Sequence, residues 1–200
     1  MTTESSVHFY LNWAKERLDE MDAALASLEA KAGGLQSGLK VKSQEFIAGL
    51  KKQRDEFRAL IDKQAKEGEA AWNHTKAELE VQWREFEARV GEYLDQFGKQ
   101  VGQQQATFQG LADAQMKAWR AAALEFQAAA GRIAAERRAQ FDARVKEMQT
   151  GAAEAEARLQ KFRQAGEESW SALNGALADS RKAFDRANQA ALDAFKHAGR

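Results

Sequence analysis

The chain has 200 residues, 30 Lys and Arg side chains against 30 Asp and Glu, and neither proline nor cysteine. The absence of cysteine excludes disulfides, thiol nucleophiles and thiolate metal sites. A chain of zero net charge has no overall attraction for nucleic acid, and no apolar run approaches the roughly 18–20 residues of a membrane span. The amino terminus lacks the pattern of a secretory signal. We therefore expect a cytoplasmic protein with no transmembrane segment and no nucleic-acid partner.

Composition predicts helix almost throughout the chain. Alanine, glutamate, lysine, arginine, glutamine and leucine dominate, and these are the strongest helix formers. β-branched residues are few and never alternate over the length of a strand, and no proline enforces a break. We expect more than about four-fifths of the residues to be helical, with at least one helix longer than about 40 residues.

The first region of helical periodicity runs from Val7 to Leu39, with apolar residues at steps of three and four. Paired glycines within residues 31–38 (KAGGLQSG) weaken the helix there and permit left-handed backbone. The apolar phase continues across Gly33 and Gly34, which favours a bend or local fraying. An antiparallel turn is the alternative at the same segment.

The second region runs from Phe46 to Phe97 and ends at the midpoint of the chain. Residues 98–110 (GKQVGQQQATFQG) contain three glycines, five glutamines and few charges, which predicts a second turn or bend. The first hundred residues carry a slight excess of acidic side chains and the last hundred a slight excess of basic ones. A fold-back here would therefore oppose halves of opposite sign.

The third region continues the apolar stripe to Phe195 at a mean spacing of about 3.6 residues, close to that of a straight helix. Aromatic residues recur every eleven positions, as in Phe86, Phe97, Phe108 and Trp119. Eleven residues are three helical turns, so these side chains share one helix face. Weaker breaks are predicted at Gly68, Gly151 and Gly166.

This stripe defines the predicted architecture. A helix with a narrow apolar stripe cannot bury that stripe alone and must pack against its own chain, another chain or an apolar surface. The pattern predicts an all-α, elongated fold, either a long-helix coiled coil or an antiparallel helical hairpin or bundle. The predicted interaction seam consists of Trp72, Trp83, Phe86, Phe97, Phe108, Trp119, Phe126, Phe141, Phe162, Trp170, Phe184 and Phe195.

No motif in the sequence indicates catalysis, a cofactor or a metal. The three histidines, His8, His74 and His197, do not lie three or four residues from one another, so they form no helical metal pair. Carboxylate pairs such as Glu16/Glu20 and Glu154/Glu156 are interpreted as solvated helix faces. The chain contains no phosphate-binding glycine loop and no nucleophile elbow. We therefore expect a protein that is not an enzyme.

Two resemblances follow from the repeat and from the carboxyl-terminal segment. The eleven-residue repeats resemble those of exchangeable apolipoproteins and of late-embryogenesis-abundant proteins. Residues 180–198 (SRKAFDRANQAALDAFKHA) resemble bacterial phasins, which coat polyester granules. These are likenesses of composition and period, and they assign no functional residue.

The sequence thus predicts a single elongated helical domain over residues 1–200 with a structural or interaction role. The leading hypothesis is a coiled-coil scaffold that forms a homo-oligomer through the aromatic seam. The alternative is an amphipathic-helix coat protein that binds peripherally to lipid or polymer-granule surfaces. Oligomer number, strand orientation and the identity of a partner are left open.

Overall fold

The computed structural model describes residues 7–98, 102–165 and 169–198, and these ranges contain helices and no strand. Helix accounts for 93% of the structure, as the composition predicts. The elements are α1 (Val7–Tyr10), α2 (Asn12–Ala32), α3 (Ser37–Glu67), the 3-10 helix η1 (Glu69–Ala71), α4 (Trp72–Gln96), α5 (Gln103–Ala130), α6 (Ala135–Ala165) and α7 (Trp170–Ala198).

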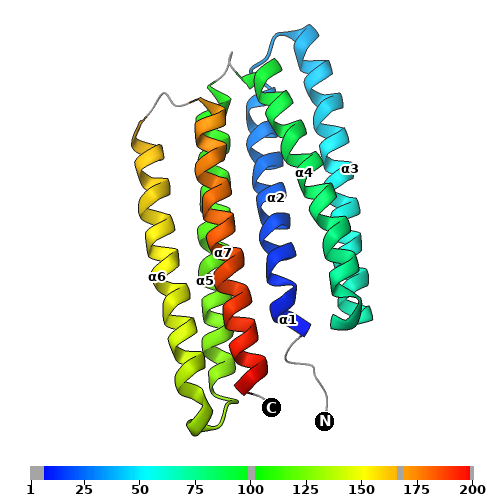
Figure 1. The fold of residues 1–200 in the computed structure, drawn as a ribbon. Helices are drawn as coiled ribbons and strands as arrows, with labels where there is room; N and C mark the ends of the chain where they lie inside the picture. The colour runs from blue at the N-terminus through cyan, green and yellow to red at the C-terminus, as the bar shows by residue number, and fades with distance from the viewer. Residues whose placement is uncertain (1–6, 99–101, 166–168, 199–200) are drawn as a thin grey trace.

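The long helices lie side by side in an elongated bundle, and each runs opposite to the one before it (Figure 1). Helices α2, α3 and α4 pack together as a first half, and α5, α6 and α7 as a second half. The halves meet mainly where α2 packs on α5, with α7 also in contact with α2. The connection between α4 and α5 joins the halves at one end of the bundle, opposite the end where α1 begins and α7 finishes.

The chain reverses direction at residues 33–36, within the glycine segment 31–38, so the antiparallel alternative applies there. Within the segment 98–110, residues 99–101 lie outside the described residues. Gly102 has a φ of 60°, a backbone conformation that favours glycine, and residues 103–110 belong to α5. A further reversal at residues 131–134, between α5 and α6, was not predicted. The sequence marks it with the single glycine Gly131, which is a weak signal for a turn.

Two of the weaker predicted breaks can be compared with the structure, whereas Gly166 lies outside the described residues. Gly68 does end α3, with a φ of 81°. Gly151 does not break the chain, because it lies inside α6 beside the Trp119 ring of α5. A Cβ there would lie 3.1 Å from that ring, so this glycine permits close helix packing.

The predicted helix of more than about 40 residues is wrong for the described ranges, where the longest helices, α3 and α6, have 31 residues each. The turns at 33–36, 68 and 131–134 divide the continuous apolar stripe into segments that pack on one another. Each segment buries its stripe against its neighbours, which removes the need for one very long helix.

The bundle core should lose stability when one of its central rings is truncated. Phe108 on α5 is fully buried, and its ring centroid lies 6.3 Å from that of Phe162 on α6. We expect Phe108→Ala to lower the free energy of unfolding by about 3–5 kcal/mol in urea denaturation, because it leaves a cavity. The control Leu124→Ala, at a position 65% exposed on the same helix, should change it by less than about 0.5 kcal/mol. Equal losses in the two variants would contradict this packing.

Candidate functional site

The structure buries most of the predicted interaction seam inside one chain. Nine of its twelve residues are buried, and the other three, Phe162, Trp170 and Phe195, are partly buried against the core. The large hydrophobic side chains that stay exposed in the described residues are Val41, Val81 and Leu124, one on each of three helices. Over the described residues, the folded bundle therefore presents no contiguous aromatic face to solvent.

The eleven-residue aromatic ladder is divided between the two halves. Phe86 lies on α4 and Phe97 directly follows its last residue, whereas Phe108 and Trp119 lie on α5, beyond the connection between the halves. In the second half these rings pair with α6 and α7: Phe108 with Phe162, and Trp119 with Phe184 at 5.3 Å between centroids. The eleven-residue period thus brings aromatic rings of neighbouring helices into contact within the second half, and it does not produce one continuous seam.

Polar residues concentrate at the interface between the halves, unlike the aromatic residues. Nine of the thirteen buried polar or charged residues take part in contacts between α2 and the helices α5 and α7. Since most side chains in the cores of the two halves are apolar, the interface between the halves is the polar layer of the molecule. These residues are Asn12, Glu16, Arg17, Glu20, Gln103, Thr107, Gln115, Arg181 and Asn188.

The Glu20–Arg181 pair lies at the centre of this layer. Arg181 on α7 donates from Nε to Glu20 Oε1 at 2.8 Å and from Nη2 to Glu20 Oε2 at 2.7 Å, so the pair is bidentate. Its Nη1 donates to Glu87 of α4 at 2.6 Å. Gln115 of α5 donates to Glu20 at 3.0 Å. One buried carboxylate and one guanidinium thereby connect four helices of both halves, and we call this group the central ion network.

A second arginine extends the network toward the end of the bundle that holds α1. Arg17 on α2 donates two hydrogen bonds to Asp185 of α7, at 3.0 and 2.8 Å. Its guanidinium carbon lies 4.9 Å from the ring centroid of Trp13, and that of Arg181 lies 4.9 Å from the ring of Trp83. Cation–π contacts of this kind stabilise desolvated arginines.

Glu16 and Glu20 form a coupled carboxyl pair inside the network. Burial, together with the nearby charge of Glu20, raises the pKa of Glu16 well above its usual value. Burial alone would raise the pKa of Glu20 as well, but the charge of Arg181 and hydrogen bonds from Arg181 and Glu16 hold it below its usual value. Of the two carboxyl groups, Glu16 therefore has the higher pKa, and Arg181 stabilises the ionised form of Glu20.

The interpretation of Glu16/Glu20 as a solvated face is wrong. Both residues are almost fully buried, because α2 packs on the first half with one side and on the second half with the other. The sequence carries a signal for this. Trp13, Glu16, Arg17 and Glu20 share a helix face that also carries apolar residues, so α2 has two partly apolar faces and no wide polar one.

Among the described residues, no group of three histidine, aspartate or glutamate side chains is placed to hold a metal ion. Within those same ranges no helix combines the length and apolarity needed to cross a bilayer. Comparisons of the chain with protein-family models, with curated proteins and with solved structures find no match.

The carboxyl pair makes a pH-dependent prediction for two conservative variants. Because the pKa of Glu16 is raised in the folded state, the free energy of unfolding falls as pH rises above the pKa of Glu16 in the unfolded chain. Glu16→Gln removes this ionisation. The variant should therefore raise the free energy of unfolding at pH 8 and change it little at pH 4. Glu20→Gln should lower it by about 3–5 kcal/mol at pH 7, because Arg181 loses its buried partner. The loss should shrink as pH falls through the lowered pKa of Glu20.

Urea denaturation at several pH values measures both effects. The exposed control Glu85→Gln on α4 should change the free energy of unfolding by less than about 0.5 kcal/mol at each pH. Destabilisation of the protein by Glu16→Gln at pH 8 would contradict the raised pKa of Glu16.

Proposed function

We propose that this protein is a peripheral coat for hydrophobic surfaces, and that its two three-helix halves part at their polar interface to expose apolar helix faces. The observation that carries the proposal is the concentration of buried polar side chains at the contact between the halves. Nine of the thirteen buried polar or charged residues lie there, beside the apolar packing of α2 on α5, whereas the contacts within each half are almost wholly apolar. Polar interfaces within a chain are the ones at which parts of a protein move relative to each other.

The energetics of the central ion network favour separation at this interface. Burying Glu20, Arg17 and Arg181 costs solvation energy that their mutual attraction repays only in part. When the halves part, water can solvate these groups again. Per unit of buried area, opening this interface therefore costs less free energy than opening an apolar interface. The contact between α6 and α7 is an example of an apolar interface.

The chain connectivity permits the same movement. The link between α4 and α5 is the single covalent connection between the halves, and it includes Gly98 and Gly102. A few residues at such a link can absorb the large φ and ψ changes of a hinge movement between packed units. The opposite end of the interface carries apolar groups, where Phe9 stacks on Phe126 at 4.3 Å and meets Phe195 at 5.1 Å. Opening would present these rings to a surface.

Self-association through the aromatic seam, the leading hypothesis from the sequence, requires an opened form as well, because the seam is covered in the folded chain. Size-exclusion chromatography with light scattering separates the two functions. A coat protein of this kind has a monomeric mass in the absence of a surface. A stable oligomer that persists on dilution would favour the scaffold and contradict the coat.

Covalent closure of the interface tests the proposal directly. Lys15 on α2 and Glu125 on α5 are exposed and paired at 4.0 Å, near the end of the interface far from the link between α4 and α5. In the double variant Lys15→Cys/Glu125→Cys, a short cleavable bismaleimide would join the halves, since the native chain has no cysteine. We expect the cross-linked variant to lose binding to small phosphatidylcholine vesicles in a flotation assay. Cleavage of the linker should restore it.

The matched control places the same cross-link within one half. Arg120 on α5 and Glu156 on α6 are exposed and paired at 2.9 Å, so Arg120→Cys/Glu156→Cys closes a contact inside the second half. This cross-linked control should bind vesicles as the uncross-linked protein does. Unimpaired binding by the closed Lys15–Glu125 variant, or equal loss in both variants, would contradict separation between the halves.

A further inference from the structure

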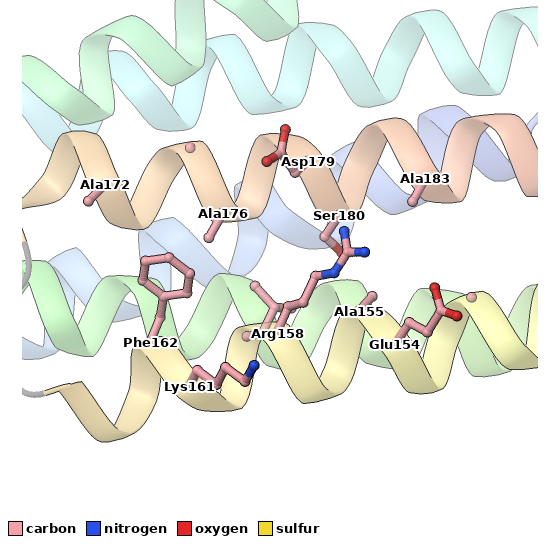
Figure 2. Close-up of a pocket in the computed structure, with 13 residues that line it drawn as sticks. Glu154, Ala155, Arg158, Lys161, Phe162, Ala172, Ala176, Asp179, Ser180 and Ala183 are labelled. Carbon is pink, nitrogen blue, oxygen red and sulfur yellow. The ribbon is translucent and has the colours of Figure 1, made fainter.

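A groove of about 420 Å³ runs between α6 and α7 on a face that the proposed opening does not involve (Figure 2). This volume is within the range of about 300–1,000 Å³ typical of pockets that hold small ligands. Its walls are mostly apolar and are built from small residues, among them Ala155 on α6 and Ala172, Ala176 and Ala183 on α7. Leu159 lies between them and is almost fully buried. An apolar groove of this volume between two helices can accommodate a hydrocarbon chain.

A buried hydroxyl without a partner lies in the wall of this groove. Ser180 on α7 is 6% exposed, and its Oγ has no hydrogen-bond partner among the described residues. In Figure 2 its side chain points from α7 toward α6, into the space between the two helices. Buried hydroxyls in folded proteins are nearly always hydrogen-bonded, so this group is available to a polar atom of a ligand.

One cation extends across the same part of the groove. The Arg158 side chain runs from α6 toward Ser180, whereas the Asp179 carboxylate points to the side of α7 away from α6 (Figure 2). Glu154 lies farther along α6, and Lys161 lies one turn from Arg158 on the other side. Within the described ranges, neither Arg158 nor Lys161 forms an ion pair. Arginine binds carboxylates through two parallel hydrogen bonds.

From this combination we infer that the α6–α7 groove binds a single-chain aliphatic carboxylate. The hydrocarbon chain lies along the alanine-lined walls, and the carboxylate accepts hydrogen bonds from Arg158 and from the Ser180 hydroxyl. The site is complete in the closed bundle, because every residue that lines it belongs to α6 or α7. The inference therefore does not rest on the proposed coat function.

Titration with decanoate, with 1-decanol as the neutral comparison, tests the inference. Calorimetry gives the affinities, and amide spectra report the position through Gly151 and Gly175, both of which line the groove. We expect saturable binding of decanoate with shifts at both glycines. Decanol should bind roughly tenfold or more weakly, since a hydrogen bond to a charged group is lost. Absence of saturable binding, or equal affinity for the two compounds, would overturn the inference.

Two variants at Gly175 separate occupation of the groove from damage to the fold. A Cβ at Gly175 meets no atom within 4 Å, so a side chain fits there without a clash and enters the groove. Gly175→Leu should weaken decanoate binding roughly tenfold or more, whereas Gly175→Ala, which removes the same glycine, should stay within about threefold of the native chain. Native affinity in Gly175→Leu would show that the ligand lies elsewhere.

The polar end of the site is tested by Arg158→Gln. This variant should lose the preference for decanoate over decanol and keep the weaker affinity for decanol, because the apolar walls are unchanged. The cross-linked Lys15→Cys/Glu125→Cys protein should bind decanoate like the native chain even when it no longer binds vesicles. Loss of decanoate binding on closure would overturn a site confined to α6 and α7, whatever the outcome for the coat function.

Discussion

The arrangement of the molecule depends on a charge pair buried where four helices meet. Glu20 and Arg181 form a bidentate pair that Glu87 and Gln115 complete, so helices from both halves contribute. Apolar side chains can pack in several registers, but a buried carboxylate is stable only where its partners meet it. The network therefore sets the register of α2 against α7 and α4, a role that a single polar residue plays in coiled coils.

The same pair explains why the interface between the halves differs from the contacts within them. A core of rings and aliphatic groups gains free energy on burial, whereas a core of charges gains little beyond its specificity. The contact between the halves therefore combines apolar packing of α2 on α5 with a polar network that adds specificity more than stability. The separation that we propose would preserve ring pairs such as Trp119 with Phe184 and would expose the faces of α2 and α5 that now pack on each other.

Much of the fold follows from the sequence, and the tertiary polar contacts do not. Composition predicted the helical content, and the glycines at 33, 34 and 68 marked real helix ends, because they report local backbone preference. At residues 33–36 the chain reverses, which was the alternative to the bend that the sequence favoured. Gly151 was misinterpreted because its role depends on Trp119, which is 32 positions away and meets it only in the folded chain. Glu16 and Glu20 look like an exposed pair for the same reason. Their burial depends on α7, at the other end of the sequence.

Distances across the interface during surface binding test the central claim most directly. Spin labels on cysteines at His74 of α4 and Gln140 of α6 report on the two halves at the end far from the link between α4 and α5. A second pair, at Gln140 and Asp193, lies along one groove within the second half. With phosphatidylcholine vesicles we expect the first distance to lengthen and the second to stay constant. Vesicle binding with both distances unchanged would show that the closed bundle binds the surface, and would contradict separation of the halves.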